Sequence, residues 1–367
     1  MTRSLKYTLF IAVCTALALI VAMRGGTRDT QNYLEVYRSL DEFPWSPVEF
    51  QAQHYMEWGY GLLTALVKLA GLPPEVLFFI VSALTFFAVA KASKAFGLEV
   101  WSAMPFYLST FFLPQQFMQI RQGLAVPLAF WAIALLIRSS RSWLLAGAVA
   151  LTSALFHIVA LLSFVVTLVG LRFTPRQRSS TNWFWTLVIF TFTVAVCRVV
   201  SSTDTFELTD RIGVYVNSEE YAATRSVFEL ANIRAILMTL AFIMFRPRDD
   251  SSHFHSYMVL LGLYIVHLGI RIGLIDFAIM SGRLGSSLAF AEIFLLPLIF
   301  LDRVRQPLWR FTLVGSYMVL HLTISLLNQL PFLIDDYFSP IYVSNFSARH
   351  QWECALFNDP IFRRVLA

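Results

Sequence analysis

Apolar segments recur along the whole chain and are separated by shorter polar connectors. Several of them approach the roughly 20 residues that a helix needs to cross the hydrocarbon core of a bilayer. Peptide groups facing lipid must be hydrogen-bonded internally, and alternating strands of about ten residues are absent, so the pattern predicts membrane helices rather than a barrel. The apolar segments are residues 5–23, 75–93, 98–113, 122–137, 143–171, 182–200, 228–245, 256–275, 284–302 and 311–328.

The first apolar segment has two interpretations. Arg3 and Lys6 precede an apolar run that contains Ala-Leu-Ala at 16–18, as in a cleaved signal peptide. The run is about 17 residues long, which exceeds a usual signal-peptide core and favours a retained membrane anchor.

Composition supports a membrane protein. Of 367 residues, 57% are hydrophobic and 14% are charged, whereas about a quarter of the residues of a soluble domain are charged. No internal repeat is evident, so we expect one transmembrane domain over residues 1–367. The three cysteines, Cys14, Cys197 and Cys354, are too scattered to predict a disulfide framework or a metal site.

The net charge of +5 is best explained by membrane topology and not by nucleic-acid binding. Short connectors rich in Lys and Arg stay in the cytoplasm. The connectors assigned to that side contain Arg3 and Lys6, Lys91 and Lys94, Arg138 and Arg141, and residues 172–178, 246–248 and 303–310. The connectors 24–56, 114–121, 201–227 and 276–283 and the tail 329–367 then lie outside, and they hold most of the acidic residues.

Two regions complicate the count of crossings. Pro73 and Pro74 separate a short apolar piece after Glu57 from the next full segment, which predicts a half-length or interfacial helix followed by a true span. The segment 143–171 must form a hairpin whose turn, at His157, lies in the outer leaflet. The expected fold is all-α, with about eleven transmembrane helices and one half-length helix.

The first outer loop contains a predicted helix. Apolar or aromatic residues at 33, 34, 37 and 40 have the spacing of a helix that lies on a membrane surface. Asp29 is either part of the N-terminal cap of this helix or a functional carboxylate. Glu57 likewise either complements the dipole of the half-length helix or takes part in chemistry.

Arg121 stands at the mouth of an uncharged span. An arginine in the membrane is costly unless its side chain reaches the headgroups or meets an anion. Gln115, Gln116, Gln119 and Gln122 surround it with polar side chains. Since a guanidinium matches phosphate oxygens with a planar fork of donors, this arrangement favours an anionic ligand.

Further polar residues share the predicted outer side. His157 is either a satisfied histidine in a turn or a proton acceptor, because its ordinary pKa is near physiological pH. Arg234, Arg271 and Arg283 also stand at outer mouths of spans. Few acidic residues lie inside the spans to pair with these arginines. Asp276 and Glu292 are the exceptions, and Asp276 is a candidate partner of Arg271.

Several other chemistries lack their motifs. The chain has no His-Glu-x-x-His helix, no Gly-Lys-Ser/Thr phosphate loop and no Gly-x-Ser-x-Gly elbow. His253 and His255 lie in a predicted cytoplasmic connector, which favours a solvated turn over a metal site.

Taken in order, five motifs resemble the EpsG family of polysaccharide-biosynthesis membrane proteins, which are similar in architecture to Wzy O-antigen polymerases. The resemblance covers about residues 20 to 300 and depends on order and spacing, since no single motif is specific. In the family the late arginine is commonly followed by aromatics, whereas here the aromatic is delayed to Phe290. The motifs are GGTRDTQNY at 25–33, EWGYGLL at 57–63, IRQGLAVPLAFWAI at 120–133, FHIVALL at 156–162 and GRLGS at 282–286.

The resemblance implies a bacterial inner-membrane glycosyltransferase with its active site facing the periplasm. It would join oligosaccharide repeat units carried on undecaprenyl diphosphate, and it would use no cofactor, no metal and no nucleic acid. Its expected partners are membrane lipids and a flippase and a chain-length regulator of the same pathway. Whether the product is O-antigen, capsule or exopolysaccharide stays open. Candidate catalytic residues are His157, Asp29 and Glu57; candidate diphosphate ligands are Arg121, Arg271, Arg283 and Arg234; candidate substrate ligands are Arg24, Arg28, Gln122, Tyr33 and Tyr60.

Two other functions remain as alternatives. A flippase or exporter of lipid-linked oligosaccharides would also use outward-facing cations, but it predicts a repeat between two halves of the chain. A membrane O-acyltransferase would use an intramembrane histidine facing the cytoplasm, whereas the predicted topology places His157 on the outer side.

Overall fold

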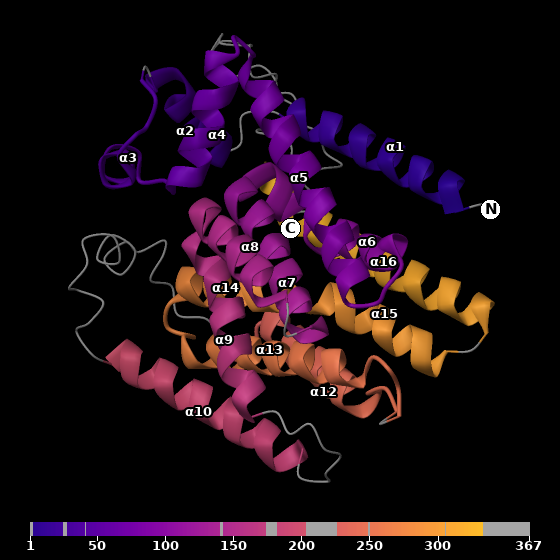
Figure 1. Ribbon diagram of the computed structural model, residues 1–367. Coiled ribbons are helices and arrows are strands. Elements are labelled where there is room, and N and C mark those ends of the chain that lie inside the picture. Colours follow the sequence, from indigo (N-terminus) through magenta and orange to yellow (C-terminus); the bar gives the residue numbers. More distant parts are fainter. Residues whose placement is uncertain are drawn as a thin grey trace, which may run out of the picture. The chain divides into compact units, whose positions relative to one another are not determined.

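A computed structural model of the protein describes residues 3–24, 28–40, 42–139, 142–173, 182–202, 226–248, 250–304 and 306–332. Within these residues every regular element is a helix (Figure 1). The N-terminal helices are α1 (Arg3–Ala22), α2 (Arg28–Ser39), α3 (Pro47–His54), α4 (Trp58–Leu69), α5 (Pro74–Ala95), α6 (Val100–Thr110), η1 (Pro114–Met118) and α7 (Ile120–Arg138). They are followed by α8 (Trp143–Phe156), η3 (Ile158–Ala160), α9 (Leu161–Phe173), α10 (Asn182–Ser202), α12 (Leu230–Met244), α13 (Phe254–Gly273), α14 (Ala278–Ala289), α15 (Glu292–Arg303) and α16 (Pro307–Phe332).

The predicted all-helical, multi-pass membrane protein is confirmed. Among the described residues, six segments are long and apolar enough to cross a membrane: Ser4–Ala22, Pro74–Ala95, Ile120–Arg138, Phe254–Gly273, Met280–Arg303 and Pro307–Leu327. Four shorter apolar helices accompany them, at Trp143–Phe156, Ile158–Leu171, Leu187–Val199 and Leu230–Met244.

The predicted count of about eleven crossings is not confirmed. Apolar content located the helices, but it did not fix their lengths. The segment 98–113 yields only the 11-residue helix α6. The segment 143–171 is divided at His157, whose backbone is extended, at the position where the sequence predicts the turn. The segment 284–302 is likewise divided between α14 and α15.

The chain divides into two compact units. Unit 1 comprises Met1–Ala83, Leu108–Ile120 and Met318–Ala367, and unit 2 comprises Leu84–Tyr107 and Arg121–Tyr317. The single transmembrane domain over residues 1–367 stays a prediction from the sequence. The predicted outer loop at 201–227 and the tail at 329–367 fall mostly outside the described residues.

Unit 2 is organised around α13, which contacts α9, α10, α12, α14 and α15. Its buried positions lie all round the helix in its second half. A separate aromatic cluster joins α7 to the α14–α15 junction, with the ring of Phe130 5.3 Å from that of Phe290 and 5.7 Å from that of Phe294. Because lipid tails are as apolar as these side chains, close packing of this kind holds membrane helices together.

Several connectors predicted to be cytoplasmic meet at one end of unit 2. The Arg303 guanidinium donates to the Arg246 carbonyl, at 3.0 Å from Nε and 2.6 Å from Nη2. A Cβ atom added to Gly97 would lie 2.9 Å from Cε1 of His253. Three basic connectors thus lie together, as the topology predicts, while Arg141 lies outside the described residues.

Unit 1 contains the predicted half-length helix. Helix α4 has 12 residues and is followed by the 22-residue helix α5, so this part of the prediction is confirmed. Two hydrogen bonds fasten α4 and the turn after it to the first outer loop: Trp58 Nε1 donates to the Pro44 carbonyl at 2.6 Å, and Tyr37 Oη donates to the Leu72 carbonyl at 2.5 Å.

The predicted surface helix at 29–40 exists as α2, but its apolar face is covered by protein. Tyr33, Leu34 and Leu40 are buried, and α2 contacts α4 and η1. The expected apolar stripe is therefore present and packs inside unit 1 instead of lying on the membrane.

Helix η1 is a π-helix, in which the amide of Gln119 donates to the carbonyl of Pro114, five residues earlier, at 3.0 Å. The wide turn places Gln115, Gln116 and Phe117 in the interior of unit 1. Ser82 Oγ donates to Gln116 Oε1 at 2.7 Å and connects η1 to α5. π-Turns inside helical segments are frequent at functional sites.

Candidate functional site

Several of the predicted site residues converge on α14, the helix that carries the GRLGS motif. Helix α14 contacts α13, α9 and η3 within unit 2 (Figure 1). Arg283 lies on α14 itself, Arg271 lies in the last turn of α13, and His157 directly precedes η3. The convergence on one short helix is the main feature of the candidate site.

Gln122 connects the start of α7 to α14. Its Nε2 donates to Ser286 Oγ at 2.9 Å and to the Arg283 carbonyl at 3.3 Å. Arg121 is its neighbour in the first turn of α7 and is partly buried. The N-terminus of a helix carries a partial positive charge, so the guanidinium and the helix dipole both favour an anion at this point.

Arg271 is held from two sides. Its Nε donates to Asn232 Oδ1 on α12 at 2.9 Å, and its carbonyl accepts from Ser281 Oγ on α14 at 3.4 Å. Gly285 allows α14 to approach this region closely, because an added Cβ would lie 3.1 Å from His267 Nδ1 and 3.3 Å from Arg271 Cγ. The second glycine of the GRLGS motif therefore has a steric role.

His157 occupies the break between α8 and α9. The helix ends at Phe156, and His157 has the extended backbone angles φ −163° and ψ 112°. Near the end of α8, Ser153 Oγ donates to the Ala125 carbonyl of α7 at 2.7 Å. The break therefore lies beside α7 and α14, and the His157 side chain is partly exposed.

Arg234 forms an ion pair inside unit 2. Its Nη2 forms a short ion pair with Glu292, which is fully buried at the start of α15. Tyr317 donates to the same carboxylate, and Tyr264 donates to its other oxygen at 3.0 Å. A carboxylate with this many donors is satisfied, so Arg234 has a structural partner.

Asp276, the candidate partner of Arg271, pairs with Arg198 instead. Its carboxylate forms an ion pair with Arg198 of α10 at 2.5 Å, and both side chains are about half exposed, at 45% and 46%. Arg198 lies outside the set of predicted site residues.

The remaining predicted residues belong to unit 1. Arg24 is 1% exposed; its Nε donates to the Val21 carbonyl at 3.1 Å, its Nη1 to the Phe117 carbonyl at 3.4 Å, and its Cζ lies 4.0 Å from the ring centre of Phe78. These contacts cap the C-terminus of α1 and connect it to η1. Arg24 is thus built into the interior of unit 1.

The two tyrosines predicted to bind sugars are also buried. Tyr33 is 3% exposed and Tyr60 is 0% exposed, and their ring centres are 5.2 Å apart. In this structure neither ring presents a face to a sugar.

The two candidate carboxylates lie at helix starts. Asp29 is in the first turn of α2, which begins one residue earlier, so its structural role is dipole complementation rather than capping. Glu57 is the N-cap of α4, and its side chain makes no capping hydrogen bond. Both are partly exposed. The side chain of Arg28 lies outside the described residues.

Comparison with known proteins decides the family. The sequence model of the EpsG family matches residues 7–333. The chain belongs to the EpsG family. No curated protein and no solved structure matches it.

Membership of the EpsG family makes this a multi-pass membrane protein of polysaccharide biosynthesis. The match covers both compact units, so the residues around α14 and those of the first outer loop all fall inside the family region. Among the described residues of this EpsG protein, no group of three or more His, Cys, Asp or Glu is arranged to hold a metal ion.

The structure makes three polar residues of this EpsG protein prominent; sequence reasoning missed Asn232, and it named Glu292 and Gln115 without predicting their surroundings. Asn232 is 1% exposed and orients Arg271; a lone asparagine near the start of an apolar segment gave only a weak signal. Glu292 was noted, but its partner was not found. Gln115 is 3% exposed, and neither of its side-chain polar atoms has a hydrogen-bond partner among the described residues.

Proposed function

We propose that this EpsG protein is a polysaccharide polymerase. It joins oligosaccharide repeat units carried on undecaprenyl diphosphate at the periplasmic face of the bacterial inner membrane. The observation that carries the proposal is the convergence of Arg121, Arg271 and Arg283 with His157 around α14, in a chain of a polysaccharide-biosynthesis family.

The chemistry of the reaction fits these residue types. A hydroxyl oxygen of one repeat unit forms a bond to the anomeric carbon of another, and the bond from that carbon to the diphosphate breaks. Negative charge therefore develops on phosphate oxygens, where fixed guanidinium groups stabilise it in place of bulk water. This step requires neither a nucleotide sugar nor a metal ion, and the electron pair of the broken bond leaves with the lipid diphosphate.

The hydroxyl proton needs an acceptor. His157 is the candidate that shares unit 2 with the three arginines, and a neutral imidazole is a suitable general base near physiological pH. Asp29 and Glu57 remain candidates in unit 1. The proposed diphosphate ligands are Arg121, Arg271 and Arg283, with Gln122 holding α14 in place. Arg234, which forms an ion pair with Glu292, is not included in this set.

The proposal is tested by incubating the purified full-length protein with lipid-linked repeat units and separating the products by size. A polymerase produces a ladder of oligomers and an equivalent amount of free undecaprenyl diphosphate. A flippase or exporter forms no new glycosidic bond, and an O-acyltransferase changes the mass of one unit without joining two. Absence of the ladder with a substrate that the cell polymerises would overturn the proposal.

A further inference from the structure

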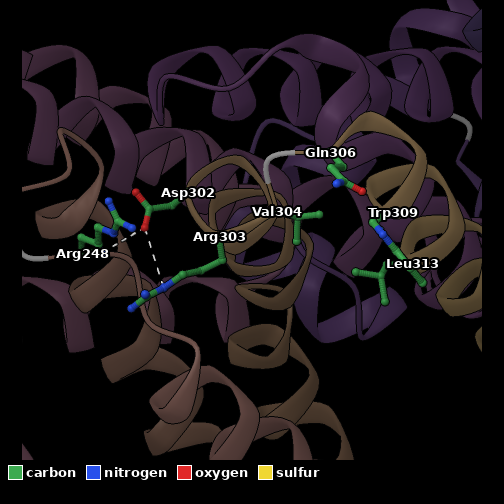
Figure 2. A pocket seen from close by; sticks show the side chains of 7 residues that line it. All are labelled: Arg248, Asp302, Arg303, Val304, Gln306, Trp309 and Leu313. Atoms are coloured by element: carbon green, nitrogen blue, oxygen red, sulfur yellow. Dashed lines mark hydrogen bonds and ion pairs between the residues drawn. The ribbon is translucent and has the colours of Figure 1, made fainter.

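A separate cavity lies at the connector end of unit 2, where α15 ends and α16 begins. It has a volume of about 570 Å³ and is lined by Arg248, Asp302, Arg303, Gln306, Trp309 and Leu313 (Figure 2). Arg248 follows the C-terminal end of α12, whereas Asn232, which holds Arg271, is in the first turn of that helix. The cavity is therefore at the opposite end of α12 from the candidate polymerase site.

One side of the cavity is basic. The guanidinium of Arg303 is fixed by its two hydrogen bonds to the Arg246 carbonyl, and Arg248 is exposed. The Asp302 carboxylate is engaged: it accepts from the Arg248 backbone amide at 2.9 Å and lies 3.9 Å from Arg303 Nε. Two guanidinium groups against one occupied carboxylate leave a net positive charge facing the cavity.

The other side of the cavity is apolar and continues into a membrane helix. Trp309 and Leu313 are four residues apart on α16 and lie together across Val304 from the arginines (Figure 2). The span Pro307–Leu327 is only 6% buried inside the protein, and Leu308 and Phe311 are 74% and 77% exposed. The apolar side of the cavity therefore leads directly to a surface that lipid tails can cover.

We infer that this cavity binds the headgroup of an anionic phospholipid, with the acyl chains lying along α16. The phosphate meets Arg248 and Arg303, the glycerol region lies at Gln306, and Trp309 is at the depth where tryptophan concentrates at membrane interfaces. The positive-inside rule puts the basic connectors 246–248 and 303–310 in the cytoplasm. Basic pockets beside membrane helices on that face are suited to anionic lipids.

The site is tested on the full-length protein in phosphatidylcholine nanodiscs with a small fraction of lipid brominated on its acyl chains. Bromine quenches nearby tryptophan fluorescence. The chain has nine tryptophans, so the signal of Trp309 is obtained by subtracting a Trp309→Phe variant. We expect brominated phosphatidylglycerol to quench Trp309 at a lower fraction in the bilayer than brominated phosphatidylcholine does.

Charge variants make the test specific. Arg248→Gln should reduce the preference for phosphatidylglycerol by about fivefold, the effect of one basic residue near an anionic lipid. Asp302→Asn should increase that preference, because it removes the opposing charge and keeps an acceptor for the Arg248 amide. Arg138→Gln, at an exposed arginine outside the cavity, should leave it unchanged.

Two results would overturn the inference. One is equal quenching of Trp309 by the two brominated lipids. The other is full loss of the phosphatidylglycerol preference on adding millimolar inorganic phosphate, which would identify a site for free phosphate rather than a lipid. Because the readout is fluorescence and not polymer formation, the result does not depend on the proposed polymerase activity.

Discussion

Asn232 accepts a hydrogen bond from Nε of Arg271 at 2.9 Å, and its own Nδ2 donates to the Ser226 carbonyl at 2.9 Å. The second bond fixes the orientation of the amide, so that its oxygen faces the guanidinium. Asn232 is uncharged, so it orients the Arg271 guanidinium without neutralising the positive charge.

Asn232→Asp should weaken use of the lipid-linked donor, because a carboxylate at this point neutralises the charge of Arg271. A hydrogen bond to a charged group contributes about 1.5–3 kcal/mol, so we expect KM for the donor to rise roughly tenfold or more. Steady-state kinetics of repeat-unit joining measures this KM. Gln53→Glu, an exposed amide-to-acid change on α3, is the charge-matched control, and an unchanged KM in Asn232→Asp would show that Arg271 does not bind the donor.

Gly285→Ala should destabilise the protein by about 1–3 kcal/mol, the usual effect of inserting a methyl group into a packed site. The new Cβ would lie 3.1 Å from His267 Nδ1 and 3.3 Å from Arg271 Cγ, so these two packed side chains must give way by a few tenths of an ångström. Thermal unfolding in detergent measures the loss. Gly282→Ala is the control on the same helix, because nothing lies within 4 Å of a Cβ there; equal effects of the two variants would contradict the close-approach argument.

Glu292→Gln should reduce stability by about 3–5 kcal/mol, since removing one member of a buried ion pair leaves the other charge uncompensated. Here the remaining charge is Arg234, which pairs with a carboxylate that is 0% exposed. Asp276→Asn breaks the half-exposed pair with Arg198 and should change stability by less than about 1 kcal/mol. Thermal shifts of similar size in the two variants would show that Glu292 is not needed to hold α15 to α12.

Arg121→Lys should shorten the polysaccharide although it keeps the positive charge. Lysine lacks the planar fork of donors that matches two phosphate oxygens, and loss of one such donor costs about 100-fold or more in rate at comparable sites. The measurement is the chain-length distribution of the cell-surface polysaccharide. Arg138→Lys, in the last turn of the same helix, should leave the distribution unchanged; a full distribution in Arg121→Lys would rule out the clamp.

Topology is tested with reporter fusions. A reporter placed after Arg141 or after Arg248 should read cytoplasmic, because both positions follow basic connectors. A reporter placed in the 201–227 loop should read periplasmic. A periplasmic signal after Arg141 would reverse the predicted sidedness of Arg121 and His157.

Much of the fold was predictable because few kinds of backbone structure can cross a bilayer. Apolar runs bounded by charge gave the positions of the helices, and the proline pair at 73–74 gave the short helix α4. The ends of helices were harder to predict. The break at His157 coincides with the turn that the sequence predicts. The break between α14 and α15 depends on backbone angles and packing that a local apolar pattern does not encode.

The candidate site was predictable in its residue types and less so in its pairings. Arginines at the mouths of spans stood out because charge is expensive there. Their partners did not, since Glu292 reaches Arg234 across 58 positions of sequence and Asn232 reaches Arg271 across 39. Tyr33 and Tyr60 were predicted to bind sugars, but they are buried and pack against each other. Aromatic side chains suited to sugars are equally suited to packing against each other.

The π-helix at Pro114–Met118 has a consequence for how this segment tolerates change. A turn closed by bonds between residues five apart contains one more residue than an α-turn, and each residue of a helix advances about 100°. Deletion of one of these five residues would either rotate Gln116, the partner of Ser82, away from α5 or change the helical register of every residue that follows. The length of this segment is thus constrained independently of which side chains it carries.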